Sequence, residues 1–191
     1  MWLDYKQYKH YRLIEELNEI ACQEKDDYVK SGKDTHVRAK ENERKKLGMG
    51  EHQAPGWDIL PVVRNGNVTE YADDLPKIKE KSMLIPGLVN CTLNVYHPGF
   101  GAPPHSDYDY DMREDVVDKK LCYVILLGVG IPSSDPLECG FDLGGDVIGI
   151  KTGDIISFDG GVVHSSWNNT NEFRYTINID LEQSFWTQAI Q

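Results

Sequence analysis

The sequence predicts a mainly β fold, a sandwich or barrel of short strands preceded by one amphipathic helix. After Ala54-Pro55-Gly56, short runs rich in β-branched and aromatic residues recur at the spacing typical of sandwiches and barrels, jelly rolls among them. Turn-forming residues separate these runs, as at Asn65-Gly66 and Lys151-Thr152-Gly153. The first part of the chain, in contrast, carries apolar residues at helical spacing.

The helix is predicted from a set of apolar residues three and four positions apart: Leu13, Ile14, Leu17, Ile20 and Ala21. Polar residues fill its other face, so we expect the helix to pack on the main domain. From Gln23 to Gly50 the chain is heavily charged, which suits either a solvated helix or a mobile segment. We therefore expect a helical, charged segment over residues 1–52 and the β fold over 53–191, together forming one domain.

The candidate strands are, in chain order, Ile59–Val63, Val89–Tyr96, Leu121–Leu127, Val147–Ile150, Asp154–Phe158, Val162–Trp167 and Phe173–Leu181. His97-Pro98-Gly99 and Asp159-Gly160-Gly161 are further turn signals between them. The final residues, Glu182–Gln191, are expected to form a short helix.

Composition excludes several classes of protein. The 191 residues carry a formal charge of −11, whereas nucleic-acid binders neutralise phosphates with a basic surface. No apolar run approaches the roughly 20 residues of a membrane span. The first residues do not resemble a secretory signal, and the cysteines form no Cys-x-x-Cys pair. We therefore expect a cytoplasmic protein with reduced cysteines and with neither a nucleic-acid nor a membrane partner.

The histidines indicate a metal site. His105 and Asp107 lie two residues apart, so in an extended segment both side chains can face one ion. His164 lies in the middle of a later candidate strand. Two imidazoles and one carboxylate on one side of an ion are the ligands of non-haem iron(II) oxygenases, and they leave open positions. A His-x-Asp pair also occurs by chance, as a surface histidine beside a solvated aspartate.

Arg174 strengthens the metal hypothesis. The strands Val162–Trp167 and Phe173–Leu181 are joined by a polar turn and are predicted to form an antiparallel hairpin. Alternation then places Ser166 on the face of His164, and Thr176 on the face of Arg174. A guanidinium about one diagonal step from His164 can bind a carboxylate through two hydrogen bonds. The alternative for Arg174 is an ordinary strand arginine paired with an acidic neighbour.

Several segments in order between Trp57 and Leu181 resemble aspartyl/asparaginyl β-hydroxylases. They are Ile85-Pro86-Gly87, Asn94–Gly99, Pro104-His105, Leu127–Pro132, and Gly153–Asn169 continuing to Arg174. The resemblance implies a double-stranded β-helix, a cupin-like jelly roll, that uses Fe(II), 2-oxoglutarate and O2. By position, His105 and His164 resemble the iron-binding histidines, and Arg174 the residue that holds the distal carboxylate of 2-oxoglutarate. Asn94 occupies the place of a small polar residue that contacts the co-substrate.

The sequence departs from the family pattern at two places. The type members have glycine two residues after the first histidine, where this chain has Asp107 and so a complete ligand triad. A carboxylate there leaves no vacancy for halide, which argues against a halogenase. The strand that carries basic residues and a histidine in the type members is apolar here, with Val124 and Leu126 at those positions. We therefore do not expect an aspartyl side chain bound in the family's manner.

Together these observations predict a dioxygenase that hydroxylates an unactivated C–H bond of an amino acid, amine or peptide side chain and releases succinate and CO2. Desaturation would use the same residues. Two alternatives remain: a cupin-type metalloenzyme that does not use 2-oxoglutarate, and a non-catalytic jelly-roll binding protein. In the first, Arg174 would have no role; in the second, His105 and His164 would face unrelated surfaces.

Other residues carry smaller expectations. The loop Ser106–Asp118 is acidic, which suits either a lid that receives a cationic substrate or a solvated loop. His97 is expected to be structural and Trp167 to pack on the face opposite His164. Tyr96 suits both the interior of the site and the core.

Overall fold

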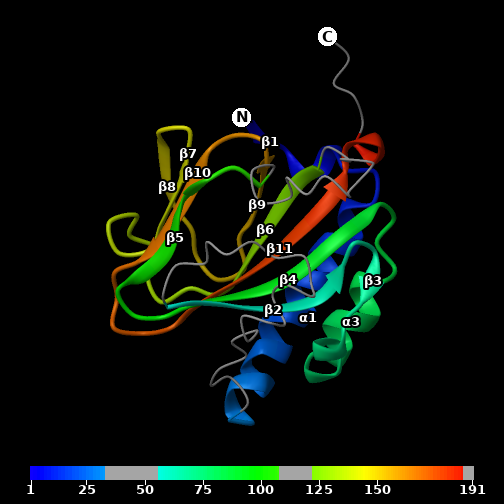
Figure 1. Ribbon diagram of the computed structural model, residues 1–191, viewed down its shortest axis with the longest axis horizontal. Helices are drawn as coiled ribbons and strands as arrows, with labels where there is room; N and C mark the ends of the chain where they lie inside the picture. Colours follow the sequence, from blue (N-terminus) through cyan, green and yellow to red (C-terminus); the bar gives the residue numbers. More distant parts are fainter. Residues whose placement is uncertain (33–55, 108–121, 187–191) are drawn as a thin grey trace, which may run out of the picture.

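Two antiparallel sheets packed face to face form the protein, as a computed structural model describes it for residues 1–32, 56–107 and 122–186 (Figure 1). The large sheet has the strand order β1-β9-β6-β11-β4-β2-β3, and the small sheet has the order β5-β10-β7-β8. From β5 onward the chain crosses from one sheet to the other after every strand except β7, which forms a hairpin with β8 in the small sheet, so the architecture is the double-stranded β-helix that the sequence predicted.

The strands of the large sheet are β1 (Trp2–Leu3), β2 (Trp57–Arg64), β3 (Asn67–Val68), β4 (Leu88–Tyr96), β6 (Cys122–Gly130), β9 (Ile155–Asp159) and β11 (Arg174–Glu182). Those of the small sheet are β5 (Phe100–His105), β7 (Gly140–Leu143), β8 (Asp146–Gly149) and β10 (His164–Asn168). The helices are α1 (Tyr11–Lys30) and α3 (Pro76–Ser82), with short 3-10 turns at Tyr5–Gln7, Glu70–Asp74 and Gln183–Phe185.

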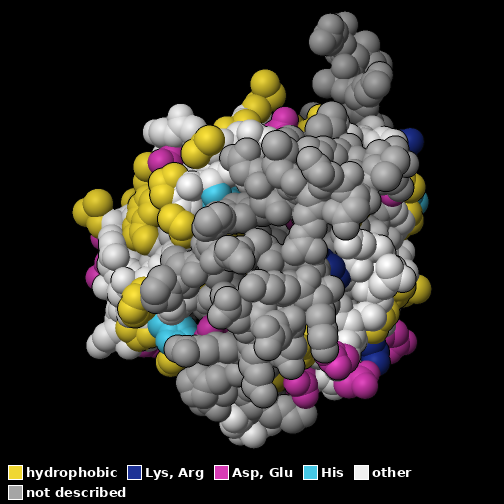
Figure 2. Space-filling view, in the orientation of Figure 1, with side chains coloured by type: hydrophobic (Ala, Val, Ile, Leu, Met, Phe, Trp, Pro, Cys, Tyr) yellow, Lys and Arg dark blue, Asp and Glu magenta, His cyan; other side chains and the backbone are white. Residues whose placement is uncertain are grey.

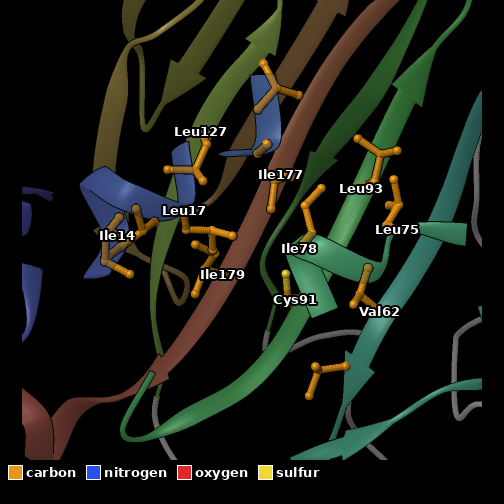
Figure 3. Close-up of a cluster of buried hydrophobic side chains, with 14 of the residues drawn as sticks. Ile14, Leu17, Val62, Leu75, Ile78, Cys91, Leu93, Leu127, Ile177 and Ile179 are labelled. Atoms are coloured by element: carbon orange, nitrogen blue, oxygen red, sulfur yellow. The ribbon is translucent and has the colours of Figure 1, made fainter. Parts of the chain in front are cut away.

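The N-terminal helix packs against the outer face of the large sheet, as predicted. Ile14 and Leu17 of α1 are fully buried against Ile177 and Ile179 of β11 in the main hydrophobic core (Figure 3). The helix continues to Lys30 because its charged second half also has buried positions. One of them, Glu24, accepts hydrogen bonds from the backbone N–H groups of Lys77 and Ile78 at 2.8 and 2.6 Å, which caps the otherwise unsatisfied first turn of α3.

Strand alternation divides the large sheet into an apolar outer face and a polar interior face. On β11 the outer residues Tyr175, Ile177, Ile179 and Leu181 belong to the main core, as predicted. The interior residues Arg174 and Thr176 lie opposite Tyr96 and Asn94 of β4 in the register of the two strands. The fold therefore directs a row of polar side chains toward the small sheet.

The outer face of the small sheet has no helix over it in the described part of the chain. Figure 2 shows hydrophobic side chains gathered on this side of the molecule, and Val147 and Val163 are about half exposed there. No helix in the described residues is both long and apolar enough to cross a bilayer.

The predicted hairpin of the last two strands is wrong. β10 pairs with β5 and β7 in the small sheet, whereas β11 pairs with β4 and β6 in the large sheet. The polar turn therefore carries the chain from one sheet to the other. Arg174 lies in the large sheet and faces the small sheet across the interior. It is therefore not the diagonal neighbour of His164 on a paired strand. Phe173, expected in the core, is 43% exposed and packs beside His97.

The structure adds elements that the sequence did not predict, namely β1, β3, β5, β7 and α3. The expected C-terminal helix is a 3-10 turn at Gln183–Phe185 within the described residues, and residues 187–191 lie outside them. The acidic loop after Asp107 also lies outside the described residues. So does the part of the charged segment that follows Gly32.

Candidate active site

His105, Asp107 and His164 lie together in the structure. β5 and β10 pair with His105 directly opposite His164, so two residues far apart in sequence become cross-strand neighbours. Asp107 follows β5, and its Oδ1 lies 3.6 Å from the Nε2 atom of each histidine. One candidate ligand atom from each residue lies within 4.8 Å of the others, a separation suited to a single metal ion.

Both imidazoles are held with Nε2 toward the centre of this cluster. The Nδ1 atom of His105 lies 2.6 Å from the carbonyl oxygen of Pro103, and that of His164 lies 2.9 Å from the carbonyl oxygen of Val162. Because a carbonyl only accepts, each Nδ1 carries the proton and each Nε2 presents a lone pair. Burial, followed by the charge of His105, lowers the pKa of His164 to about 4, so this ring is neutral and able to bind a cation.

The turn Asp159-Gly160-Gly161 positions Asp107. The backbone N–H of Asp107 donates to the carbonyl of Gly160 at 2.9 Å, and the hydroxyl of Ser106 lies 3.3 Å from the carbonyl of Gly161. A Cβ atom at Gly160 would lie 2.9 Å from Oδ2 of Asp107, closer than real Cβ contacts allow. Glycine at this position therefore leaves the room that the carboxylate occupies.

Replacing Gly160 with alanine should displace the Asp107 carboxylate and weaken metal binding by about 10- to 100-fold, the cost typical of a lost outer partner. Calorimetric titration with Fe(II) under anaerobic conditions measures this effect. The melting temperature of the apoprotein serves as the control for folding. Unchanged iron affinity in a folded Gly160→Ala variant would show that Asp107 does not depend on this contact.

Arg174 is fully buried, and its guanidinium is only partly satisfied. Nη1 donates to the carbonyl oxygens of Gly140 and Trp167 at 2.9 and 2.6 Å. Nε and Nη2 have no hydrogen-bond partner among the described residues, and no carboxylate of these residues forms an ion pair with the guanidinium. Burial lowers the pKa of Arg174. An uncompensated buried charge costs about 3–5 kcal/mol, so this side chain is suited to an anionic ligand with two acceptor atoms.

The other predicted co-substrate residues also lie on the interior faces. Asn94 and Thr176 are direct partners on β4 and β11, and Ser166 lies on β10 two residues after His164. All three side chains are buried. Nδ2 of Asn94, Oγ of Ser166 and Oγ1 of Thr176 have no hydrogen-bond partner among the described residues. Buried polar atoms are normally paired, so this part of the interior is prepared for a polar ligand.

Tyr96 is a further buried residue near Arg174. The guanidinium carbon of Arg174 is 5.3 Å from the centre of its ring. Burial raises the pKa of the Tyr96 phenol, whereas the charge of Arg174 and the nearby hydroxyl groups of Ser166 and Thr176 oppose this shift; the charge of Asp107 makes the smallest contribution and adds to it. The phenol therefore lies within electrostatic range of both charged groups, which places Tyr96 in the site.

Trp57 is a site residue that the sequence reasoning missed. Its ring stacks on Tyr96 at 5.9 Å and lies 5.8 Å from the ring of His105. Its Nε1 donates to Oδ1 of Asn94 at 3.0 Å. The available signal was an aromatic residue at the start of a strand, directly after Ala54-Pro55-Gly56.

An apolar wall adjoins the histidines. Phe141 and Phe158 lie 5.8 and 4.9 Å from the ring of His164, and both belong to a second buried cluster. Val124 and Leu126 belong to the same cluster, as the apolar character of their strand predicted. Along the interior face of β11, exposure increases from the fully buried Arg174 toward Asp180, so the interior is closed at the arginine.

The remaining histidine and tryptophan expectations are also resolved. His97 lies outside the metal cluster, with Nε2 2.7 Å from a carboxylate oxygen of Asp58. Trp167 lies on the face of β10 opposite His164, and its Nε1 donates to the carbonyl of Pro136. The position of His97 outside the cluster and the packing of Trp167 on the opposite face are as predicted.

Comparison with known families decides the classification. The sequence model of the aspartyl/asparaginyl β-hydroxylases matches residues 11–184. The chain belongs to this family. The match includes α1 and the strands from β2 to β11. No curated protein sequence matches this β-hydroxylase family member.

Solved structures similar to this β-hydroxylase family member are distant. They include a cupin 2 conserved barrel domain protein from Salinispora arenicola (14% identity, 50% of this chain, 65% of the other, TM-score 0.35). Another is a salicylate 1,2-dioxygenase from Pseudoaminobacter salicylatoxidans (11% identity, 72% of this chain, 28% of the other, TM-score 0.41). A third is a 2OG-Fe(II) oxygenase family oxidoreductase from Burkholderia pseudomallei (12% identity, 72% of this chain, 75% of the other, TM-score 0.47). The chain spans less than two-thirds of the first two proteins. Likenesses of this strength carry no functional argument.

Proposed function

We propose that this β-hydroxylase family member is an Fe(II)- and 2-oxoglutarate-dependent dioxygenase. It would hydroxylate an unactivated C–H bond of an amino acid, amine or peptide side chain. One observation carries the proposal. A fully buried arginine, whose Nε and Nη2 atoms have no hydrogen-bond partner in the described part of the chain, shares the interior of the β-helix with a cluster of two histidines and an aspartate.

The ligand chemistry of the cluster fits Fe(II). Two neutral imidazole nitrogens and one carboxylate oxygen can occupy one side of an octahedral ion and leave the other positions open. Open positions are necessary because a bidentate keto acid and dioxygen must both reach the metal. When bound, the ferrous ion supplies dioxygen activation, with 2-oxoglutarate converted to succinate and CO2 and a hydroxyl group transferred to the substrate.

The protein's own residues bind and orient the co-substrate in this proposal. Nε and Nη2 of Arg174 donate to the distal carboxylate, and their fork geometry matches its two oxygens. Asn94, Ser166 and Thr176 offer buried hydrogen-bonding atoms along the same interior faces. The apolar side chains around His164 limit the access of water to the reacting atoms.

Charge balance favours the same assignment. The ferrous ion and Arg174 supply the positive charges of the assembled site, and Asp107 and the 2-oxoglutarate dianion supply the negative ones. Their sum is zero. A neutral assembly is the arrangement that a buried, apolar-walled interior tolerates best.

The substrate is proposed to be cationic, such as a basic amino acid or an amine. The loop that follows Asp107 has five acidic residues and three basic ones between residues 108 and 121 in the sequence, and it lies outside the described residues. Net negative charge in the segment that directly follows the candidate ligand Asp107 in the chain would favour a positively charged substrate.

Anaerobic addition of Fe(II) and then 2-oxoglutarate to the purified protein tests the proposal. We expect a weak metal-to-ligand charge-transfer band in the visible spectrum, because bidentate binding of the keto acid to ferrous iron produces one. Iron binding without the band would favour a cupin-type metalloenzyme that does not use a keto acid. The absence of iron binding would favour a non-catalytic binding protein. Screening amino acids, amines and short peptides for stimulated succinate release then identifies the substrate.

A further inference from the structure

The Asn94 side chain has different surroundings at its two ends. Oδ1 accepts a hydrogen bond from Nε1 of Trp57 at 3.0 Å. Nδ2 is buried and has no hydrogen-bond partner among the described residues, although the whole residue is only 2% exposed. An unused pair of N–H donors is therefore present in the interior, beside Thr176 in the register of β4 and β11.

The hydrogen bond from Trp57 determines the orientation of the Asn94 side-chain amide. A 180° turn exchanges the oxygen and nitrogen of an asparagine with almost no change in shape, so packing alone does not select the orientation. An indole N–H can only donate, and it therefore requires the oxygen on its own side. The nitrogen of Asn94 is consequently directed away from Trp57.

We propose that Trp57 is a positioning residue for the co-substrate: it holds Asn94 as a hydrogen-bond donor toward a carboxylate of 2-oxoglutarate. This inference rests on the proposed function. In the opposite amide orientation, lone pairs of Oδ1 would face the carboxylate, and the contact would be repulsive. One indole hydrogen bond thus sets the polarity of a neutral side chain in an anion-binding interior.

The position of Trp57 is itself well determined. Its ring lies nearly parallel to that of Tyr96, with 14° between the planes, and Trp57 and Tyr96 are direct partners in the register of β2 and β4. The same indole lies 5.8 Å from the ring of His105. A rotation of the indole would therefore lose the Asn94 hydrogen bond and both ring contacts together.

The Trp57→Phe variant isolates the hydrogen bond, because phenylalanine keeps an aromatic ring on Tyr96 but has no N–H. We expect the 2-oxoglutarate concentration that half-saturates the charge-transfer band to rise roughly 2- to 10-fold, the equivalent of one hydrogen bond. Fe(II) affinity is expected to stay unchanged. The matched control is Tyr5→Phe, which removes a side-chain hydrogen bond to Glu15 of α1, remote from the site, and should leave the half-saturation concentration unchanged.

Asparagine variants separate positioning from packing. Asn94→Asp keeps an oxygen for the Trp57 hydrogen bond but presents a negative acceptor in place of the donor. It should weaken 2-oxoglutarate binding by about 100-fold, and the melting temperature of the apoprotein measures any effect of the buried carboxylate on folding. In an Asn94→Ser background there is no amide to orient, so adding Trp57→Phe should cause no further loss.

The outcomes are distinguishable. If the parent protein binds 2-oxoglutarate and Trp57→Phe leaves the half-saturation concentration unchanged, the positioning role is wrong and the proposed function stands. An equal loss from Trp57→Phe in the parent and Asn94→Ser backgrounds would also overturn the role, because Trp57 would then act independently of Asn94. If the parent protein gives no 2-oxoglutarate band, the proposed function fails and this inference fails with it.

Discussion

The Arg174→Ala variant will need at least about 30-fold more 2-oxoglutarate for half-saturation than the parent protein, while its Fe(II) affinity remains the same. The reason is the buried position of the guanidinium, whose Nε and Nη2 atoms have no partner among the described residues. Without Arg174, the distal carboxylate of the keto acid would lose its counter-charge in an interior that water cannot compensate. The charge-transfer titration, followed by 2-oxoglutarate-dependent succinate release, measures the effect.

Two further variants distinguish the loss of 2-oxoglutarate binding from a loss of folding. Arg174 also donates to the carbonyls of Gly140 and Trp167, so its removal affects the contact between the two sheets. Arg174→Lys keeps the positive charge without the planar fork and should fall between the parent and Arg174→Ala. Arg12→Ala removes a cation from α1, outside the site, and should behave as the parent does. Equal 2-oxoglutarate-dependent turnover in Arg174→Ala and the parent would remove the anchor assignment.

The His164→Ala variant will lose Fe(II) binding, by more than the roughly 100-fold that follows from losing an outer partner of a ligand. His164 presents a neutral Nε2 toward Asp107, and its Nδ1 is already committed to the carbonyl of Val162. No other histidine of the described residues joins the cluster with His105. Anaerobic calorimetry with Fe(II) measures the loss.

The matched control for this loss is His97→Ala. His97 is also a partly buried histidine beside a carboxylate, that of Asp58, but it lies outside the cluster. Fe(II) affinity should therefore survive its removal. Comparable iron affinity in His164→Ala and the parent would place the metal elsewhere and exclude the proposed centre.

The sequence was most informative where alternation and spacing alone decide the outcome. The period of two in β11 separated Arg174 and Thr176 from the outer core residues, whereas Asp107 reaches the cluster from just beyond the end of β5. Alternation is a local property, because each residue of an extended strand points opposite to its neighbours whatever the strand pairs with.

Strand pairing was less accessible to sequence reasoning. The turn between β10 and β11 looked like that of a hairpin, but the two strands lie in different sheets. β5 was missed because Phe100–His105 contains Pro103 and Pro104 and resembles a turn. Proline is tolerated there because β5 is an edge strand, with β10 as its only neighbour in the sheet order. α3 was missed because its first turn is capped by Glu24, which belongs to α1.

The sequence by itself determined the mainly β fold and the N-terminal helix, and it singled out the three candidate metal ligands and Arg174 as the candidate co-substrate residue. Only the tertiary structure showed that Arg174 reaches the interior from the opposite sheet and that Trp57 donates a hydrogen bond to Asn94. The physical reason is that residue type and spacing specify what a side chain can do and which face it occupies. The partner that it meets there depends on strand pairing between segments distant in the chain, which the spacing of residues does not encode.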